Sequence, residues 1–481
     1  MTNTDRSLRA VVLAAGQGTR MKSDKPKVLH PVMGKTILDR VLDATAEAGV
    51  ERAHVVIGHG AKLIEAHLGE NSPSTSMKWS THLQEPQLGT GHALMQVKDG
   101  LEGFQGDLIV TVGDAPLLKG DTLQSLVRKH REDDAMVTVL SAIVEDPKSY
   151  GRVVRDSQNQ ITAIVEAKDA TEEQIRICEV NAAIYCLKWP EVEAGLDQLS
   201  NDNKQNEYYL TDLVSWASKN SLKLSCQIAE DWREVAGINS RLELAEVNNH
   251  LRHDTVNKLA LESGVTIIDP ASTWIAPEVK IGKDSIVYPG CEITGAVEIG
   301  SGSTIGPGAI IRASSKSSVT IGNGCTIINS VVLDSRIGDG CRIGPFSHVR
   351  EGNDLADGVR VGNFVELKKT KVGARTNVSH LSYVGDATLG SGANVGAGTI
   401  TANYDHITKV KARTILGDGA STGSNSVLVA PVHIGDNAVV GAGTVVTKDV
   451  PAGALAVGRA KQIQKEGWAE KRKEISTAAT K

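Results

Sequence analysis

The amino-acid sequence predicts an α/β domain joined to an all-β domain, and three observations lead to that fold class. The chain has 481 residues, which is more than one hydrophobic core usually organises. Up to about residue 240, short apolar runs alternate with helical patterns, as they do in β-α-β units. Beyond Gly264 lie 30 of the 48 glycines, and aliphatic residues there recur at every sixth position, which is not a helical period.

The first half is expected to form a Rossmann-like sheet. Apolar runs at 9–16, 52–60 and 107–118 predict strands, and 36–49 and 89–101 predict helices. In open sheets of this kind, ligands bind beyond the carboxyl ends of the strands. The glycine-rich loop after Ala14 and the segment "GDAPL", which begins at Gly113, both follow such strand ends. We therefore expect the two loops to converge on one site.

Residues 240–261 predict a helix, because Leu244, Val247, Leu251 and Leu259 recur at roughly helical spacing. This helix either connects the two domains or is the last helix of the first one, and the pattern does not separate the two interpretations. Both give the same division of the chain: a first domain over 1–240, a helix over 241–262 and a second domain over 263–481.

The second half predicts a left-handed parallel β-helix of hexapeptide repeats, in which each short strand turns one aliphatic side chain inward. The inward positions form four runs: Ile299, Ile305 and Ile311; Ile337, Ile343 and Val349; Leu389 and Val395; and Ile434, Val440 and Val446. The period slips by one residue near Val372 and is interrupted over 401–417, where polar residues cluster. Interruptions of a solenoid form surface loops, so a second site is expected there.

The composition excludes several classes of protein. With 52 Lys and Arg against 57 Asp and Glu, the net charge of -5 speaks against a nucleic-acid partner. The six cysteines show no CxxC pair and the 13 histidines no HExxH frame, so we expect free thiols rather than disulfides or zinc. No apolar run is long enough to cross a membrane, which predicts a soluble, cytoplasmic protein without membrane insertion.

The stretch "LAAGQGTRMKSDKPKVLH", which begins at Leu13, predicts a phosphate site. Backbone amides of Gly16 to Thr19 at a strand end can form an anion cradle, to which Arg20 and Lys27 add positive charge. Asp114, which follows a strand and a glycine, is placed to hold a hard cation such as Mg²⁺ on the same phosphates. On composition alone, a plain strand-end turn with a solvated aspartate explains the stretch about equally well.

Here a family resemblance becomes specific. The opening stretch resembles the signature of sugar-nucleotide pyrophosphorylases, and "LQEPQLGTGHA", "GDAPLL", "SYGRVV", "IVEAKDA", "EVNAAIY" and "EVAGINSRLELAEVN" continue the match in order. With its hexapeptide half, the whole chain is similar to the bacterial bifunctional N-acetylglucosamine-1-phosphate uridyltransferase and glucosamine-1-phosphate N-acetyltransferase family. Relatives usually carry Thr-Gly where this chain has Ala182 and Ala183, and often Tyr at the position of Val112.

The resemblance implies that glucosamine 1-phosphate is first acetylated from acetyl-CoA. N-acetylglucosamine 1-phosphate then takes a uridylyl group from UTP with Mg²⁺, giving UDP-N-acetylglucosamine for bacterial peptidoglycan. It implies the following uridylyl-transfer residues: Arg20 and Lys27 as catalytic cations; Leu13, Ala14, Ala15, Gly16, Lys27, Gln84, Gly89, Thr90, Gly113 and Asp114 for the nucleotide; Gly151, Glu166, Asn181 and Asn239 for the sugar phosphate; and Asp114 and Asn239 for the metal.

The resemblance also implies a second site, for acetyl transfer. His380, in "SHLSYVGDA", would be the base, with Glu366 assisting. Arg350, Lys368, Tyr383 and Asn394 would bind glucosamine 1-phosphate, and Ala397, Asn403, Tyr404, Ser424, Ala442 and Arg459 would line the acetyl-CoA site. The family's β-helices assemble as homotrimers, and "QKEGWAEKRKE" resembles its closing helix.

Two other interpretations remain. In the first, the chain is a pyrophosphorylase with a single activity whose β-helix only assembles the oligomer. In the second, it is a regulatory or exchange-factor subunit that combines the same two folds without sugar chemistry. The set of His380, Tyr383, Asn403 and Tyr404 speaks against the first, and the joint presence of Arg20, Lys27, Asp114 and Asn239 speaks against the second.

Overall fold

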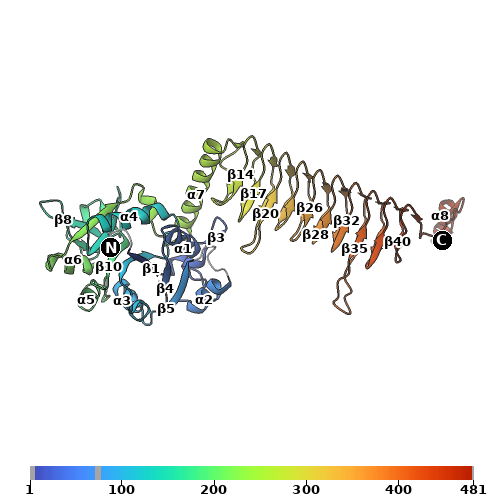
Figure 1. Cartoon of the computed structure of the whole chain (residues 1–481). Coiled ribbons are helices and arrows are strands. Elements are labelled where there is room, and N and C mark those ends of the chain that lie inside the picture. Colours follow the sequence, from blue (N-terminus) through green and yellow to red (C-terminus); the bar gives the residue numbers. More distant parts are fainter. Residues whose placement is uncertain (1–5, 71–76, 479–481) are drawn as a thin grey trace. The chain divides into compact units, whose positions relative to one another are not determined.

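The computed structural model describes residues 6–70 and 77–478, and the chain divides into two compact units, Met1–Thr255 and Val256–Lys481 (Figure 1). The helix predicted at 240–261 is α7 (Arg241–Glu262). The division between the two units falls within this helix, between residues 255 and 256.

The first unit is built on one mixed sheet with the central order β11-β7-β10-β6-β1-β4-β5. The strands of this sheet are β1 (Ser7–Leu13), β4 (Arg52–Ile57), β5 (Lys78–Leu83), β6 (Gly106–Val112), β7 (Val137–Ile143), β8 (Arg152–Arg155), β9 (Ile161–Val165), β10 (Glu179–Trp189) and β11 (Leu224–Ile228). The helices are α1 (Ile37–Glu47), α2 (Ala61–Glu70), α3 (Thr90–Met95), α4 (Gly120–Glu132), α5 (Glu193–Leu196) and α6 (Asp212–Lys219). A separate small ribbon pairs β2 (Pro31–Val32) with β3 (Lys35–Thr36).

The sheet confirms the expected alternation of strands and helices, with one difference. Strand β10 runs antiparallel to both of its neighbours, β6 and β7. The segment between β7 and β10 forms the hairpin β8–β9 instead of a helix over one face. Because no helix carries the chain back across the sheet, β10 enters from the edge at which β7 left it.

Apolar side chains fill both faces of this sheet, as expected for strands covered by helices on two sides. Along β1, Ala10 and Val12 pack on one face against residues of α1, α2 and α4, whereas Val11 packs on the other against α3 and α6. Helix α1 begins at a capping box in which Thr36 accepts from the amide of Asp39 and Asp39 accepts from that of Thr36.

The loop after β1 is held down by a third apolar cluster. Met21, which is only 1% exposed, packs with Ile238 and with Val247 of α7. Met21 stands where a dinucleotide-binding fingerprint needs its third glycine. The structure shows that this position fixes the loop to the first half of α7.

The second unit is the predicted left-handed β-helix, with three ladders of parallel strands. The first ladder contains β12 (Thr266–Ile267), β15 (Ile286–Val287), β18 (Thr304–Gly306), β21 (Thr326–Ile328), β24 (Arg342–Ile343), β27 (Arg360–Asn363), β30 (Asn377–His380), β33 (Asn394–Val395), β36 (Ser421–Thr422), β39 (Val439–Val440) and β41 (Leu455–Ala456). The second contains β13 (Trp274–Ile275), β16 (Glu292–Thr294), β19 (Ile310–Arg312), β22 (Val331–Leu333), β25 (His348–Val349), β28 (Glu366–Lys368), β31 (Tyr383–Gly385), β34 (Ile400–Ala402), β37 (Val427–Val429) and β40 (Val445–Val446). The third contains β14 (Lys280–Ile281), β17 (Val297–Ile299), β20 (Val319–Ile321), β23 (Arg336–Ile337), β26 (Asp354–Leu355), β29 (Lys371–Val372), β32 (Ala387–Leu389), β35 (Thr414–Leu416) and β38 (Val432–Ile434). A final helix, α8, covers Trp468–Ala478.

The predicted inward register is confirmed, because every aliphatic residue named in the four runs is buried. Near the predicted slip, the inward residues Leu367 and Val372 stand five positions apart instead of six. The predicted interruption over 401–417 contains an exposed loop in which Tyr404 and Lys411 form an isolated antiparallel bridge. A second, shorter insertion at 313–318, between β19 and β20, was not anticipated.

All six cysteines are free, as expected. Among the described residues, no helix has the length and apolar character required to span a membrane.

Candidate functional site

The loop after β1 exposes a run of backbone amides. The N–H groups of Gly16, Gln17, Gly18 and Thr19 donate no hydrogen bond within the part of the chain that the structure describes. Gly18 has a φ of 59°, and a Cβ there would lie 2.7 Å from Cβ of Lys27, so a side chain has no room. The loop thus closes over Lys27 with its amides free, which fits the predicted anion cradle.

Lys27, Asp114 and Asn239 form a cluster beside this loop. The Lys27 ammonium forms an ion pair with the Asp114 carboxylate and donates to Oδ1 of Asn239 at 3.2 Å. Asp114 follows β6, and its carbonyl accepts from the amide of Ile238 at 2.9 Å, which joins the two loops. Three residues far apart in the sequence therefore meet at the carboxyl edge of the sheet.

This cluster also tests the predicted Mg²⁺ site. Oxygens of Asp114 and Asn239 both contact one ammonium group, so they converge on a single cation. Across residues 6–70 and 77–478, no group of three or more His, Cys, Asp or Glu side chains could hold a metal. Two protein oxygens nevertheless fit Mg²⁺, which commonly takes its other ligands from water and substrate phosphates.

Arg20 behaves differently from Lys27. Its side chain is exposed, and within the described residues it forms no hydrogen bond or ion pair. The structure therefore leaves Arg20 outside the cluster that Lys27 joins.

A second group of predicted nucleotide residues lies between the end of β5 and the start of α3. It consists of Gln84, Gly89 and Thr90. Gln84 is buried, and its Nε2 donates to the carbonyl of Gly89 at 2.9 Å. Oγ1 of Thr90 accepts from the amide of Leu210 at 3.1 Å. The amide of Tyr208 bonds to the carbonyl of Leu88 at 2.8 Å, which fixes the segment 207–210 against Gly89.

Gly151, Glu166 and Asn181 also come together. The amide of Asn181 donates to the carbonyl of Gly151 at 2.9 Å, and a Cβ on Gly151 would lie 3.4 Å from Oε1 of Glu166. Burial raises the pKa of Glu166, and the nearby carboxylates of Asp169 and Asp212 add to that shift. This half-buried carboxyl group is suited to accept hydrogen bonds from hydroxyl groups of a sugar.

One residue around this pocket was missed from the sequence. Tyr185 is fully buried, and Nδ2 of Asn181 donates to its hydroxyl group at 2.7 Å; burial raises the pKa of this phenol. Its spacing of four residues from Asn181 on one strand places the two side chains on the same face, a signal that could have been used.

On the β-helix, Arg350 and Lys368 belong to one charged network. Nη1 of Arg350 donates to Oε1 of Glu366 at 3.0 Å, and Nζ of Lys368 lies 3.3 Å from Oε1 of Glu351. The bond to Glu366 raises the pKa of Arg350. Tyr383 stands beside Glu366 in the next coil. Glu351 was not singled out in the sequence, although it directly follows Arg350.

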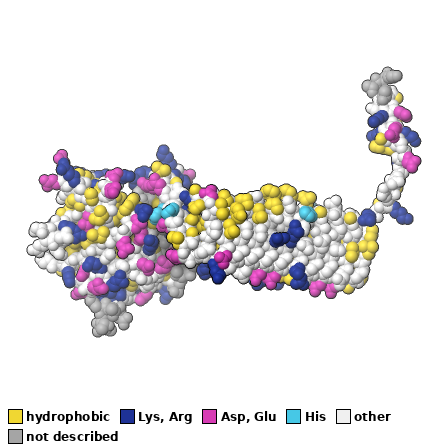
Figure 2. All heavy atoms as spheres, turned by 90° about the horizontal axis from the view of Figure 1, so that it is seen from above, with side chains coloured by type: hydrophobic (Ala, Val, Ile, Leu, Met, Phe, Trp, Pro, Cys, Tyr) yellow, Lys and Arg dark blue, Asp and Glu magenta, His cyan; other side chains and the backbone are white. Residues whose placement is uncertain are grey.

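His380 is exposed at the end of β30 and pairs in register with Asn363. Three exposed apolar residues, Phe346, Phe364 and Leu381, occupy positive-φ corners of successive coils beside it. The rings of Phe346 and Phe364 stack with centroids 5.6 Å apart. Figure 2 shows exposed hydrophobic side chains gathered on the β-helix surface.

The predicted acetyl-CoA residues divide into two groups. Ala397, Ser424 and Ala442 lie on successive coils: the carbonyl of Ala397 accepts from Asn425, that of Ser424 from Gly443, and that of Ala442 from Nη1 of Arg459. Asn403 is buried, and its Nδ2 donates to Asp386 at 2.6 Å, whereas Tyr404 is half exposed in the long loop. Asn394 is exposed on β33, one rung above Asn377.

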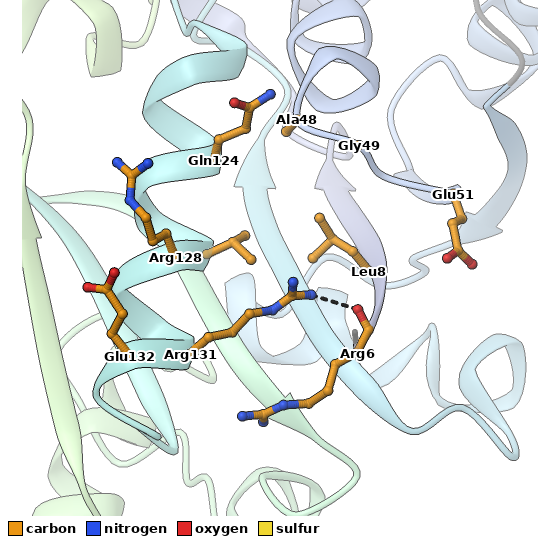
Figure 3. Close-up of a pocket in the computed structure, with 10 residues that line it drawn as sticks. Arg6, Leu8, Ala48, Gly49, Glu51, Gln124, Arg128, Arg131 and Glu132 are labelled. Atoms are coloured by element: carbon orange, nitrogen blue, oxygen red, sulfur yellow. Dashed lines mark hydrogen bonds between the residues drawn. The ribbon is translucent and has the colours of Figure 1, made fainter. Parts of the chain in front are cut away.

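A cavity of about 590 Å³ in the first unit lies away from all of these residues (Figure 3). Its lining comes from the start of β1, the loop after α1 and helix α4, which is the opposite edge of the sheet from the glycine loop. Arg131, which donates to the carbonyl of Arg6 at 2.6 Å, reaches across it. None of the predicted site residues lines this cavity.

Two family models match the chain. The Nucleotidyl transferase model matches residues 9–250, and the Bacterial transferase hexapeptide (six repeats) model matches 278–313 and 413–448. The chain thus carries a nucleotidyltransferase domain and a hexapeptide transferase domain.

Curated relatives that bear the name "Bifunctional protein GlmU" match along nearly the whole chain, and three of them illustrate the match. The protein of Synechococcus sp. (strain CC9605) is 45% identical over 97% of this chain and 100% of the relative. That of Clostridium perfringens (strain SM101) is 46% identical over 96% and 99%, and that of Heliobacterium modesticaldum is 47% identical over 95% and 97%. With both domains present and matched from end to end, the chain belongs to the family of the bifunctional protein GlmU.

Proposed function

We propose that this chain makes UDP-N-acetylglucosamine in two steps at two sites. The β-helix transfers acetyl from acetyl-CoA to glucosamine 1-phosphate, and the first unit transfers a uridylyl group from UTP to the N-acetylglucosamine 1-phosphate so formed. The observation that carries the first-unit activity is the cluster of Lys27, Asp114 and Asn239 beside four free backbone amides. The two functional domains divide at the ends of α7, residues 240 and 263.

In uridylyl transfer, a phosphate oxygen of the sugar phosphate attacks the α-phosphorus of UTP, and pyrophosphate leaves. The nucleophile is already an anion, so the reaction needs positioning and charge neutralisation more than a base. The amides of Gly16 to Thr19 and the ammonium of Lys27 supply fixed positive charge for the triphosphate, and Arg20, which has no partner in the described residues, is free to join them. Leu13 to Ala15, Gln84, Gly89, Thr90 and Gly113 surround the nucleoside.

Mg²⁺ bound by Asp114 and Asn239 would neutralise further charge on the phosphates. Gly151, Glu166 and Asn181 hold the sugar, because their backbone and carboxyl groups lie together and Glu166 can accept from sugar hydroxyl groups.

In acetyl transfer, the amine of glucosamine 1-phosphate attacks the thioester carbonyl of acetyl-CoA, and the thiol of CoA leaves. His380 takes the proton of the amine, since an exposed imidazole at a coil corner can reach a bound sugar. Arg350 and Lys368 bind the sugar phosphate, with Tyr383 and Asn394 beside it, and Glu366 orients Arg350. The corners at Ala397, Ser424 and Ala442 form the wall along which acetyl-CoA lies, closed by Arg459, Asn403 and Tyr404.

Three finer features complete the proposal. The chain forms a homotrimer, and the exposed apolar surface of Phe346, Phe364 and Leu381 beside His380 supports self-association because another copy would cover it. The enzyme acts in the cytoplasm, where UTP and acetyl-CoA are available. Its product serves peptidoglycan synthesis.

The proposal is tested by offering glucosamine 1-phosphate, acetyl-CoA, UTP and Mg²⁺ to the full chain and following CoA, pyrophosphate and UDP-N-acetylglucosamine. Omitting acetyl-CoA should stop all three products, and supplying N-acetylglucosamine 1-phosphate instead should restore the pyrophosphate. Release of pyrophosphate from glucosamine 1-phosphate without acetyl-CoA would contradict the proposed order of steps.

A further inference from the structure

Arg152 is an unusual residue of the first unit, because it is only 2% exposed and has no acidic partner among the described residues. A buried guanidinium group without a counter-ion is costly unless hydrogen bonds satisfy it. Here backbone carbonyls do so. Nη1 donates to Tyr150, Nη2 donates to Lys148 at 3.2 Å, and both Nε and Nη2 donate to Ile175 at 3.3 Å.

These three carbonyls belong to two loops that flank the predicted sugar pocket. Lys148 and Tyr150 lie within the three residues before Gly151, and Ile175 lies in the segment that leads into β10 and Asn181. Arg152 therefore ties together the two segments that carry Gly151 and Asn181. The bond between the Asn181 amide and the Gly151 carbonyl, at 2.9 Å, closes the same arrangement.

Tyr150 extends the connection to the other half of the site. Its side chain packs against the main core, and its hydroxyl group lies near the backbone of Gly237 and near the Asp114 carboxylate. A Cβ on Gly237 would lie 3.2 Å from Oδ1 of Asp114, and Nδ2 of Asn239 donates to the carbonyl of Gly237 at 3.3 Å. Tyr150 thus lies beside the segment that carries Asn239 and packs against Asp114, the two predicted metal ligands.

We propose that Arg152 and Tyr150 are positioning residues that hold the sugar-phosphate loop and the metal-ligand loop at a fixed separation. This inference rests on the proposed uridylyl transfer, in which the sugar phosphate must meet the α-phosphorus of UTP. Neither side chain is assigned a contact with substrate. Displacing the reacting groups by even 1 Å can lower the rate substantially, so the connection matters for activity without touching the chemistry.

The test compares Arg152→Lys and Tyr150→Phe with the matched control Arg155→Lys in the full chain. Arg155 lies on the same strand and is also mostly buried, but it pairs with Glu179 and contacts neither loop. Lysine keeps the charge at 152 and loses the fork that binds three carbonyls, whereas phenylalanine removes only the hydroxyl group that reaches Gly237.

For Arg152→Lys we expect kcat/KM for N-acetylglucosamine 1-phosphate to fall about tenfold, mainly through KM, with KM for UTP unchanged. For Tyr150→Phe we expect kcat to fall about fivefold and the half-saturating Mg²⁺ concentration to rise, with the melting temperature within about two degrees of wild type. Arg155→Lys should retain wild-type kinetic constants. Acetyl transfer by the same preparations should not change in any variant, which shows that the chain is at the stated concentration, while the melting temperature of each variant reports whether the first unit is folded.

The possible results distinguish a failure of the positioning role from a failure of the proposed uridylyl transfer. An active wild-type chain in which Arg152→Lys and Tyr150→Phe both behave like Arg155→Lys contradicts the positioning role alone. The same is true if Arg152→Lys lowers the melting temperature yet leaves KM for the sugar phosphate unchanged below the transition. A wild-type chain without any uridylyl transfer contradicts the proposed function, and the positioning role with it.

Discussion

Replacing Ile343 with aspartate probes the packing on which the β-helix depends. Ile343 is 2% exposed and points inward from β24, between Ile327 and Val361 of the adjacent coils, which are fully buried. Losing this aliphatic contact costs about 1.5–3 kcal/mol. Placing a carboxylate in the same interior costs several kcal/mol more. The sum, roughly 5 kcal/mol or above, is comparable with the whole stability of many domains.

The matched control is Arg342→Asp, because Arg342 precedes Ile343 on the same strand and is exposed. The assay is urea denaturation of the full chain followed by circular dichroism, with acetyl and uridylyl transfer measured beside it. We expect Ile343→Asp to abolish the β-helix transition and acetyl transfer while uridylyl transfer remains, and Arg342→Asp to behave like wild type. If both variants unfold at the urea concentration of the wild type, the inward register of the hexapeptide repeats is wrong.

Four further predictions follow from the two sites. Asp114→Ala should lower Mg²⁺-dependent pyrophosphate release at least about 100-fold without affecting acetyl transfer, and full uridylyl transfer by this variant would refute the metal assignment. His380→Ala should lower CoA release from acetyl-CoA about 100-fold or more in a thiol assay and leave uridylyl transfer unchanged. Loss of both activities together would contradict two separate sites. Ala183 has a φ of 54°, in the left-handed region that favours glycine, so Ala183→Gly should stabilise the first unit by about 1 kcal/mol, seen as a rise of a few degrees in melting temperature, and a fall would contradict strain at this position. Burial raises the pKa of Glu166 above its ordinary value of 4.5, so its charged form destabilises the folded state at neutral pH, and this cost disappears as the pH falls through the folded pKa. The Glu166→Gln variant should therefore melt at a higher temperature than wild type at pH 7.5 and at the same temperature near pH 4. Equal melting temperatures at both pH values would show that the carboxyl group is solvated.

Periodic features of the fold could be predicted well from the sequence. The inward aliphatic positions and the break over 401–417 both depend on a local repeat, so reading the spacing was enough to place them. The direction of β10 could not be obtained in this way. It depends on the hairpin β8–β9 replacing a crossover helix, a choice that the strand patterns themselves do not reveal.

Some features of the site could likewise be predicted from the sequence, and others could not. Convergence of the glycine loop and Asp114 followed from topology, because both come after parallel strands of one sheet. The contacts of Lys27, by contrast, join it to Asp114, 87 positions away in the sequence, and to Asn239, 212 positions away. Only the fold shows that Lys27 joins this cluster and Arg20 does not. Glu351 could not be predicted because its role is set by contacts with other side chains, whereas the spacing of Tyr185 from Asn181 was a signal that could have been used.

The most direct test of the account is the stoichiometry of CoA and pyrophosphate when the full chain converts glucosamine 1-phosphate with acetyl-CoA, UTP and Mg²⁺. The account predicts one CoA for each pyrophosphate at completion, with CoA appearing first. A chain that releases pyrophosphate from N-acetylglucosamine 1-phosphate but releases no CoA from acetyl-CoA and glucosamine 1-phosphate would contradict it, and would leave the β-helix as an assembly element only.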